Sequence, residues 1–135
     1  MNLSRQTFRK TERLCSNRVI AELFEKGNQF FTPYFRVIWD LNTGVRKSPA
    51  QILVSIPKRE IKKAVKRNLI RRRIKEAYRK NKNQLYECLE NIDISINIIL
   101  VFRKNDVPDY QETEQAVKDF LARLSEVLKG KGQKC

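Results

Sequence analysis

Apolar residues recur at helical spacing near the start of the chain. Four of them occupy positions i, i+1, i+4 and i+5: Val19, Ile20, Leu23 and Phe24. This is the pattern of a short amphipathic helix. Ser16 is a suitable N-cap residue and Gly27 a suitable C′ residue. We therefore expect a helix over about residues 17–26.

The next apolar segments have the composition of strands. Residues 30–39 are rich in aromatic and β-branched side chains, with Pro33 near the start, which predicts one strand or two short ones near a sheet edge. Residues 42–49 have the composition of a loop. Residues 51–56 predict a compact strand that stops at Pro57. Isoleucine, leucine and phenylalanine alternate with other residues over 94–102, which is the clearest strand pattern in the chain.

Two longer helices complete the pattern. A highly charged helix is expected over about 62–82, and an amphipathic helix over 113–129. The element order is then α-β-β-β-α-β-α, which predicts an α+β fold: a two-layer sandwich with a mostly antiparallel sheet. At 135 residues the chain is expected to form a single domain, ordered over about 12–129, with short basic tails at both ends.

Charge is concentrated in one part of the chain. The formal net charge is +14, and thirteen of the 29 Lys and Arg residues lie between Lys58 and Lys82, where only Glu60 and Glu76 are acidic. Such a density repels itself unless a polyanion neutralises it. Nucleic acid is therefore the expected partner.

Cysteine and histidine usage argues against a zinc site. The three cysteines are widely spaced, form no C-x-x-C pair, and have no histidine to complete a zinc site. The longest apolar run is about half the length of a membrane helix, and the N-terminus lacks the apolar region of a signal peptide. We expect a cytoplasmic protein in a reducing compartment, with no membrane partner.

The charged helix has two different sides. At about 100° per residue, Ile70, Ile74 and Ala77 form an apolar stripe. The opposite stripe is polar and mostly basic: Asn68, Arg72, Lys75 and Arg79. A charged helix can simply keep a solvated face, but solvated faces favour interleaved signs. The nearly unbroken positive charge favours contact with phosphates, which guanidinium groups bind in bidentate fashion.

The choice between DNA and RNA depends on the element that precedes this helix. A helix-turn-helix protein would place another helix there, joined by a tight turn. A strand is predicted instead, ending at Pro57. This favours a protein that reads phosphates or shape, and structured RNA is recognised mainly by its shape.

The segment 64–79, AVKRNLIRRRIKEAYR, closely resembles the signature helix of the protein subunit of bacterial ribonuclease P. The resemblance covers roughly residues 12–125. It includes Arg13-Leu14, the segment LFEKG at 23–27, the strand and loop ILVSIPKR at 52–59, an isoleucine-rich late strand and a closing amphipathic helix. The family has an α+β fold with a left-handed β-α-β crossover, an exception to the usual handedness.

The resemblance implies a function. The family's protein assists endonucleolytic removal of the 5′ leader from precursor tRNA, in a ribonucleoprotein whose RNA subunit is the catalyst and requires Mg²⁺. The partners expected from the resemblance are that RNA and precursor tRNA, and no DNA is expected. The candidate contacts to the catalytic RNA are Lys66, Arg67, Asn68, Arg71, Arg72, Lys75 and Arg79.

The family's leader cleft lies between the first helix and the sheet. Phe24 matches one of its aromatic residues, whereas the aromatic neighbour one turn earlier is Ile20 here. A second departure is Leu69, where the family motif has an Arg. Aromatic side chains near a basic sheet can stack unpaired bases, although core packing is the commoner role of any single one. Strand alternation and the neighbouring loop complete the expected set of leader contacts: Ile20, Phe24, Tyr34, Arg36, Ile38, Lys58 and Arg59.

The sequence offers no catalytic site on the protein itself. Hydrolysis of a phosphodiester needs a base or a metal, and the chain has no histidine. Asp93, Asp106 and Asp109 flank the late strand but are not expected to bind a metal, and no glycine-rich phosphate loop is present. Two other functions remain open: a structural RNA-binding protein of ribosomal type without substrate contact, and a DNA-binding regulator.

Overall fold

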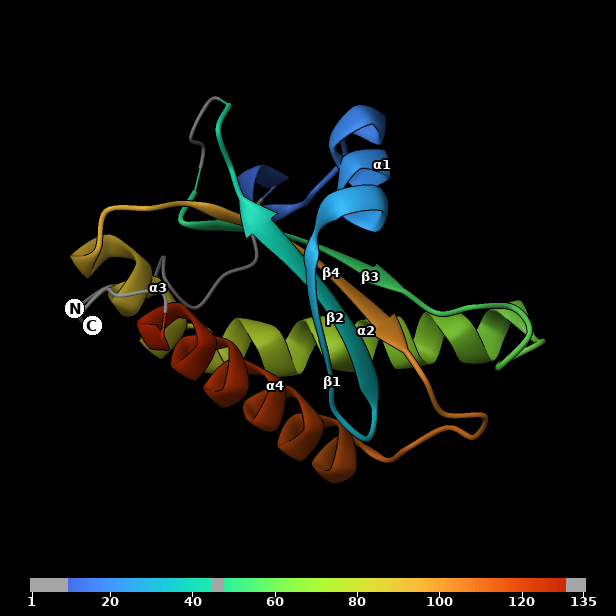
Figure 1. The fold of residues 1–135 in the computed structure, drawn as a ribbon. Helices are drawn as coiled ribbons and strands as arrows, with labels where there is room; N and C mark the ends of the chain where they lie inside the picture. The colour runs from blue at the N-terminus through green and yellow to red at the C-terminus, as the bar shows by residue number, and fades with distance from the viewer. Residues whose placement is uncertain (1–9, 45–47, 131–135) are drawn as a thin grey trace.

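A computed structural model of the chain describes residues 10–44 and 48–130. Its centre is a four-stranded sheet with the strand order β1-β2-β4-β3 (Figure 1). The strands are β1 (Asn28–Phe31), β2 (Phe35–Leu41), β3 (Ala50–Ser55) and β4 (Ile96–Phe102). Two of the three pairings, β1 with β2 and β2 with β4, are antiparallel, and β3 pairs with β4 in parallel. The predicted α+β class and mostly antiparallel sheet are confirmed.

The aromatic segment forms two strands rather than one. Thr32 closes the hairpin between β1 and β2: its N–H donates to the Phe35 carbonyl at 2.8 Å and its Oγ1 accepts the Phe35 N–H at 3.0 Å. Pro33 lies in this turn, where a missing N–H costs nothing. Strand β1 is at the edge of the sheet, as the sequence indicated.

Three helices cover one face of the sheet: α2 (Ala64–Asn81), α3 (Asn83–Asn91) and α4 (Tyr110–Gly130). The main core lies between them and the sheet. Ile70, Ile74 and Ala77 of α2 are fully buried there, facing Phe120 and Leu124 of α4. The apolar stripe predicted for the charged helix is therefore the side that packs.

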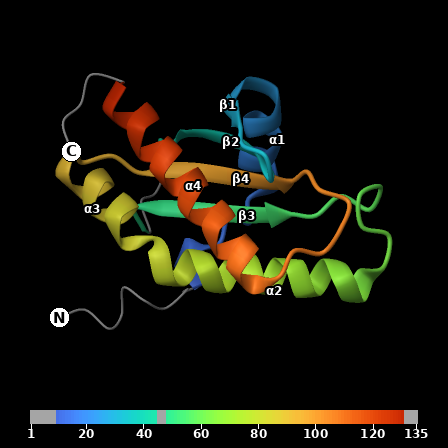
Figure 2. The same ribbon diagram turned by 90° about the horizontal axis from the view of Figure 1, so that it is seen from below.

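The connection from β3 through α2 and α3 to β4 joins parallel neighbours. Figure 2 shows these helices in front of the sheet, with β3 and β4 pointing the same way and β4 on the far side of β3 from α2. With the strands turned to point upward, β4 lies to the left of β3, which makes the crossover left-handed. This confirms the handedness that the family resemblance implied.

Within residues 10–44 and 48–130, the one α-helix on the other face of the sheet is α1 (Asn17–Lys26). Ser16 is its N-cap, with Oγ accepting the Val19 N–H at 3.3 Å, as predicted. A second, smaller core lies beneath it and contains Leu14, Leu23, Ile38 and Ile99. The sheet is thus buried on both faces only where α1 crosses it.

Gly27 directly follows the last residue of α1, as predicted. Many glycines in this place are left-handed, but Gly27 has φ −66° and ψ 156°, which any residue adopts. Its constraint is space, because an added Cβ would lie 2.6 Å from the Leu23 carbonyl oxygen and 2.7 Å from the Ile38 Cγ2.

An N-terminal segment runs beside β3. The 3₁₀ turn Lys10–Glu12 is followed by Arg13, which bridges to Ile52 in parallel register. The Leu14 N–H donates to the Ile52 carbonyl at 3.0 Å, and the Gln51 Nε2 donates to the Thr11 carbonyl at 3.0 Å. These bonds occupy part of the open edge of β3, where unpaired backbone groups would otherwise remain.

The structure adds one helix to the predicted elements. The sequence predicts no element over 83–91, yet this segment forms α3, and its Leu85, Tyr86 and Leu89 reach the core. The strand predicted over 94–102 is confirmed as β4, and six of its seven residues are buried because it is central in the sheet. Most of the two expected tails, residues 1–9 and 131–135, lies outside the described residues, as does 45–47 of the predicted loop.

Candidate nucleic-acid interface

The outward side of α2 carries the residues predicted to bind RNA. Lys66, Asn68 and Arg72 are exposed. The other four predicted contacts are partly exposed: Arg67, Arg71, Lys75 and Arg79. Five of the seven line one hollow: Asn68, Arg71, Arg72, Lys75 and Arg79. Together with Arg67, one turn before Arg71, they form what we call the α2 basic face, whereas Lys66 lines a different hollow. The helix packs through its opposite side, so this face is open to a ligand.

The α2 basic face is hollowed. A shallow depression of about 640 Å³ is lined by basic residues of α2, by Asn68 and Glu76, and at its far wall by Tyr110 of α4. The Tyr110 hydroxyl is buried and has no hydrogen-bond partner within the described part of the chain. A curved surface with several guanidinium groups and one carboxylate suits the backbone of a folded RNA.

The guanidinium groups are oriented mainly by neutral acceptors. Arg71 Nη1 donates to Asn68 Oδ1 at 3.0 Å, and Arg73 Nη1 donates to the Pro108 carbonyl at 2.6 Å. Arg67 Nη1 donates to the carbonyls of Ile61 and Lys62 at 2.9 and 2.8 Å. Neutral partners fix these side chains without cancelling their charge. Phosphates can still be attracted to them.

Arg79 differs from its neighbours because it is paired with an acid. Its Nε and Nη2 donate to Glu76 Oε1 and Oε2 at 3.0 and 2.7 Å. The bond to Arg79 lowers the pKa of Glu76 and raises that of Arg79. Part of its charge is therefore already compensated, and Arg79 is the weakest of the predicted phosphate contacts.

Lys75 lies in an unfavourable place for a cation. Partial burial, and then repulsion by Arg13 and Arg71, lower the pKa of its ammonium group. Arg13 comes from the N-terminal segment beside β3, so the positive surface extends beyond α2. A bound phosphate would remove this repulsion.

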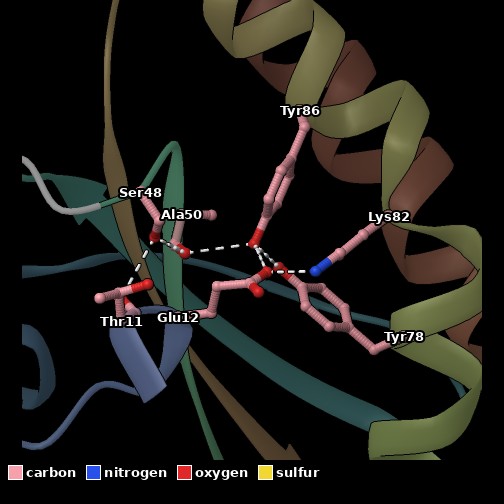
Figure 3. A network of polar contacts seen from close by, with 7 residues as sticks. All are labelled: Thr11, Glu12, Ser48, Ala50, Tyr78, Lys82 and Tyr86. Atoms are coloured by element: carbon pink, nitrogen blue, oxygen red, sulfur yellow. Dashed lines mark hydrogen bonds and ion pairs between the residues drawn. The ribbon is translucent and has the colours of Figure 1, made fainter. Parts of the chain in front are cut away.

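Lys82, at the end of the same basic segment, has a different role. It is 1% exposed and forms an ion pair with Glu12, whose Oε2 also accepts the Tyr86 hydroxyl (Figure 3). The Tyr78 hydroxyl lies 3.5 Å from that of Tyr86, and burial raises the pKa of both phenols. This network ties the N-terminal segment to α2, and Lys82 does not contribute to the surface.

The surface beside α1 contains part of the predicted leader site. Phe24 is 44% exposed, and the Arg36 guanidinium lies 5.9 Å from the centre of its ring. Ile20 packs, partly buried, on the same flank of α1. We call the surface formed by these three residues, two apolar and one cationic, the α1 groove, after the leader cleft that the family resemblance implies.

Two residues assigned to this groove are misplaced. Ile38 points to the α1 face, as strand alternation requires, but it is 0% exposed because α1 covers it. Tyr34 precedes β2 and lies in the hairpin turn, so alternation does not apply to it. It packs against the main core on the other face and hydrogen-bonds Glu112 at 3.4 Å. Neither residue belongs to the groove.

Phe31 is an accessible aromatic residue that sequence reasoning did not assign. It is 53% exposed, pairs with Arg36 in the β1–β2 hairpin, and has the Arg103 guanidinium 4.9 Å from its ring centre. In the hairpin, Phe31 is the residue opposite Arg36. This pairing depends on the position of the turn, which the sequence pattern alone did not fix. The exposed Lys58 and Arg59 follow β3 at this same end of the sheet.

The described residues contain no group of three or more His, Cys, Asp or Glu side chains that could hold a metal ion. Over the same residues, no helix combines the length and the apolar character that crossing a membrane requires.

Comparison with known proteins assigns the family. The ribonuclease P family model matches residues 8–125. The ribonuclease P protein component of Porphyromonas gingivalis strain ATCC 33277 is 33% identical over 116 residues, which cover 86% of this chain and 85% of that protein. The component from Petrotoga mobilis is 42% identical over 77 residues, covering 57% and 62%.

Solved structures agree on the fold. The Staphylococcus aureus RNase P protein superimposes with a TM-score of 0.64 at 19% identity, covering 86% of this chain and 96% of that one. The Thermotoga maritima protein gives 0.64 at 22% identity, covering 83% and 96%. A basic face on α2, a shared fold and a family match over most of the chain lead to one assignment: the chain belongs to the ribonuclease P protein component family.

Proposed function

We propose that the chain holds the catalytic RNA of ribonuclease P on the α2 basic face and the 5′ leader of precursor tRNA in the α1 groove. Its family membership gives it a role in tRNA 5′ processing as a ribonuclease P subunit. The proposal concerns how the two surfaces divide that work. The observation that carries it is the 640 Å³ hollow on α2, whose several cations face a single carboxylate.

The α2 basic face would act through phosphate neutralisation. Each phosphate contact releases condensed counterions, so binding is strong and falls steeply with salt. Arg67 and Arg71 are held in place by neutral acceptors, so less side-chain entropy is lost when phosphate binds. Leu69, which replaces the family's usual Arg, is partly buried beside another hollow. Three lysines and two acids line that hollow: Lys62, Lys63, Lys66, Glu60 and Asp106. The lysines outnumber the acids and supply positive charge where that Arg is missing.

The α1 groove would hold unpaired nucleotides. Phe24 and Phe31 present exposed ring faces, and Arg36 and Arg103 lie beside them. Bases stack on aromatic rings regardless of sequence, which suits leaders of varied sequence. Lys58 and Arg59 at the same end of the sheet would contact the leader backbone.

The protein's contribution to cleavage is then positioning. With the leader bound on one surface and the catalytic RNA on another, the scissile bond is presented to the RNA and its Mg²⁺ ions. In this proposal the RNA subunit supplies the chemistry, and the chain supplies no nucleophile, base or metal ligand.

Leader dependence tests the proposal. Adding the chain to ribonuclease P RNA at low Mg²⁺ should raise kcat/KM for precursor tRNA, and shortening the leader to one nucleotide should remove most of that gain. Phe24→Ala should likewise weaken binding of precursor tRNA by about 1–3 kcal/mol while leaving mature tRNA unaffected. Circular dichroism checks that the variant is folded.

The same measurements separate the alternatives. A gain that is independent of the leader would indicate a structural RNA-binding protein without substrate contact. Equal losses for precursor and mature tRNA would assign Phe24 to packing. Comparable affinity for duplex DNA and structured RNA would favour a DNA-binding regulator.

A further inference from the structure

A segment near the start of the chain links the α2 basic face to a buried ion pair. We call residues 10–14, which lie along the outer edge of β3, the N-terminal strap. We propose that Glu12 is a positioning residue for RNA binding, because its buried pair with Lys82 holds the strap where Arg13 completes a phosphate site on α2. This inference rests on the proposed role of the α2 basic face and assigns to it a residue from outside α2.

Two buried side chains anchor the N-terminal strap, one on either side of Arg13. Glu12 is 4% exposed and reaches Lys82, between α2 and α3, and Tyr86 of α3 (Figure 3). Leu14 is 3% exposed and packs in the smaller core beneath α1. Arg13, between the two anchors, is exposed. The strap is therefore held in an orientation that presents the arginine to solvent.

The register of the strap decides which charge it presents. Its backbone is held by the hydrogen bond from the Leu14 N–H to the Ile52 carbonyl. A shift by one residue along β3 would turn Arg13 inward and Glu12 outward, since successive side chains of a strand-like segment point to opposite sides. A carboxylate would then replace a cation on the surface. The pair with Lys82 opposes this shift, because a buried charge that loses its partner is strongly destabilising.

The exposed Arg13 lies close to two cations of α2. Partial burial, then repulsion by Arg13 and then repulsion by Arg71 lower the pKa of the Lys75 ammonium group. Lys75 and Arg71 line the hollow of the α2 basic face, so Arg13 adds positive charge to it from a neighbouring element. Cations at close range repel one another, and a bound anion relieves that repulsion. Two guanidinium groups and one ammonium group suit a phosphate, which guanidinium binds through two oxygens.

The buried ion pair is better suited to fixing a position than to adding stability. Desolvation offsets much of the attraction between two buried charges, so apolar residues of similar size in place of Glu12 and Lys82 would stabilise the fold about as well. Apolar contacts tolerate small shifts, whereas the carboxylate here meets both the Lys82 ammonium group and the Tyr86 hydroxyl. The pair therefore specifies where the strap lies, and with it the position of Arg13.

Salt-dependent binding of ribonuclease P RNA to the full-length chain tests the inference. Arg13→Ala should flatten the dependence of log K on log salt by about one unit, as expected for one lost phosphate contact. The control is Arg123→Ala, which removes an exposed arginine of α4 beside Phe30 of β1, at the opposite edge of the sheet, and should leave the slope unchanged.

Arg72→Ala separates this inference from the proposed function. An unchanged slope in Arg72→Ala would refute the role of the α2 basic face, and this inference with it. A slope that is flattened in Arg72→Ala but unchanged in Arg13→Ala would overturn only the role of the strap.

The double variant Glu12→Gln with Lys82→Met tests the positioning role. It removes both buried charges, so the strap loses its fixed register and the salt slope should match that of Arg13→Ala. Adding Arg13→Ala to the double variant should then flatten the slope no further, because the two changes remove the same contact. A purely structural ion pair would not give this result. Binding of the double variant equal to that of the unchanged chain, or additive losses, would overturn the inference.

Hydrogen exchange of the Leu14 amide keeps the inference testable if the double variant does not fold. This N–H donates to the Ile52 carbonyl and therefore reports whether the strap is docked. Bound RNA should slow its exchange at least about tenfold in the unchanged chain, because a phosphate at Arg13 stabilises the docked strap. In Arg13→Ala, bound RNA should slow it much less. Equal slowing in the two proteins would contradict a link between the strap and the RNA.

Discussion

Arg72 and Lys82 lie ten positions apart in one basic segment and carry the same charge, yet their environments are opposite. Arg72 is exposed on the α2 basic face and borders its hollow. Lys82 is 1% exposed and paired with Glu12 beneath the N-terminal segment. One is available to a polyanion, and the other holds two parts of the chain together.

The difference arises from an acid that is distant in sequence. Glu12 precedes Lys82 by 70 residues and reaches it only because the segment 10–14 pairs with the edge of β3. Along most of α2, the nearby groups are carbonyls, amides or other cations. A run of basic residues in the sequence therefore predicts a basic surface only where the fold brings no distant acidic residue into contact with the run.

The largest expected effect comes from breaking the buried pair. Lys82→Ala leaves Glu12 charged and buried without its cation, which should lower the free energy of unfolding by about 3–5 kcal/mol. Urea denaturation followed by circular dichroism measures this. Lys66→Ala, a truncation of an exposed lysine on α2, should change it by less than about 0.5 kcal/mol. Similar changes in the free energy of unfolding for both variants would contradict the different roles of the buried and the exposed lysine.

Replacing both buried charges tests whether the instability of Lys82→Ala comes from the unpaired charge of Glu12. The double variant Glu12→Gln with Lys82→Met removes the ion pair while keeping an acceptor for the Tyr86 hydroxyl. It should recover at least about 2 kcal/mol of the loss seen in Lys82→Ala, because no charge remains buried alone. A double variant as unstable as Lys82→Ala would show that packing rather than charge explains the loss.

Arg72 and Arg67 should differ in a smaller way. Arg72→Ala should flatten the dependence of log K on log salt for the catalytic RNA by about one unit, with unchanged stability. Arg67→Ala should give a similar change and should also destabilise the fold by about 1 kcal/mol, because the carbonyls of Ile61 and Lys62 lose a charged donor. Lys118→Ala on α4 is the control. An unchanged slope in both variants would remove them from the interface.

The smallest expected effect concerns Lys75. It tests whether a cation on the α2 basic face destabilises the folded protein, in contrast to Lys82, which stabilises it. Its pKa is lowered from 10.5 in the folded protein, so the charged form destabilises the native state at neutral pH. The penalty is complete below the lowered pKa and disappears as pH rises from there through 10.5. Lys75→Gln should therefore slightly stabilise the free protein at pH 7, with a shrinking gain in alkaline solution, and should weaken RNA binding. Thermal unfolding across pH tests this, and a loss of stability at pH 7 would contradict it.

Much of the fold could be predicted because periodicity reports which side of an element is buried. The stripe of Ile70, Ile74 and Ala77 located the packed side of α2 and hence its basic face. Ser16 marked the start of α1 within one residue. Helix α3 was missed because its nine residues are too few for a clear period beside a charged helix.

The site could be predicted only in part. Strand alternation shows which face of the sheet a side chain points to, but not whether another element covers that side chain. Ile38 points to the expected face but is covered by α1, which no strand pattern reveals. Tyr34 was placed by extending the strand one residue too far into the turn. Phe31 was missed because its neighbours depend on the hairpin register, and the role of Lys82 depends on an acid 70 residues away.

Gly27 allows the end of α1 to lie close to the sheet. The last turn of α1 and the Ile38 side chain both approach this residue so closely that a single methyl group would separate them. Gly27→Ala would therefore push the C-terminal end of the helix away from β2, without altering Ile20, Phe24 or Arg36. The spacing between helix and strand thus depends on a residue that has no side chain.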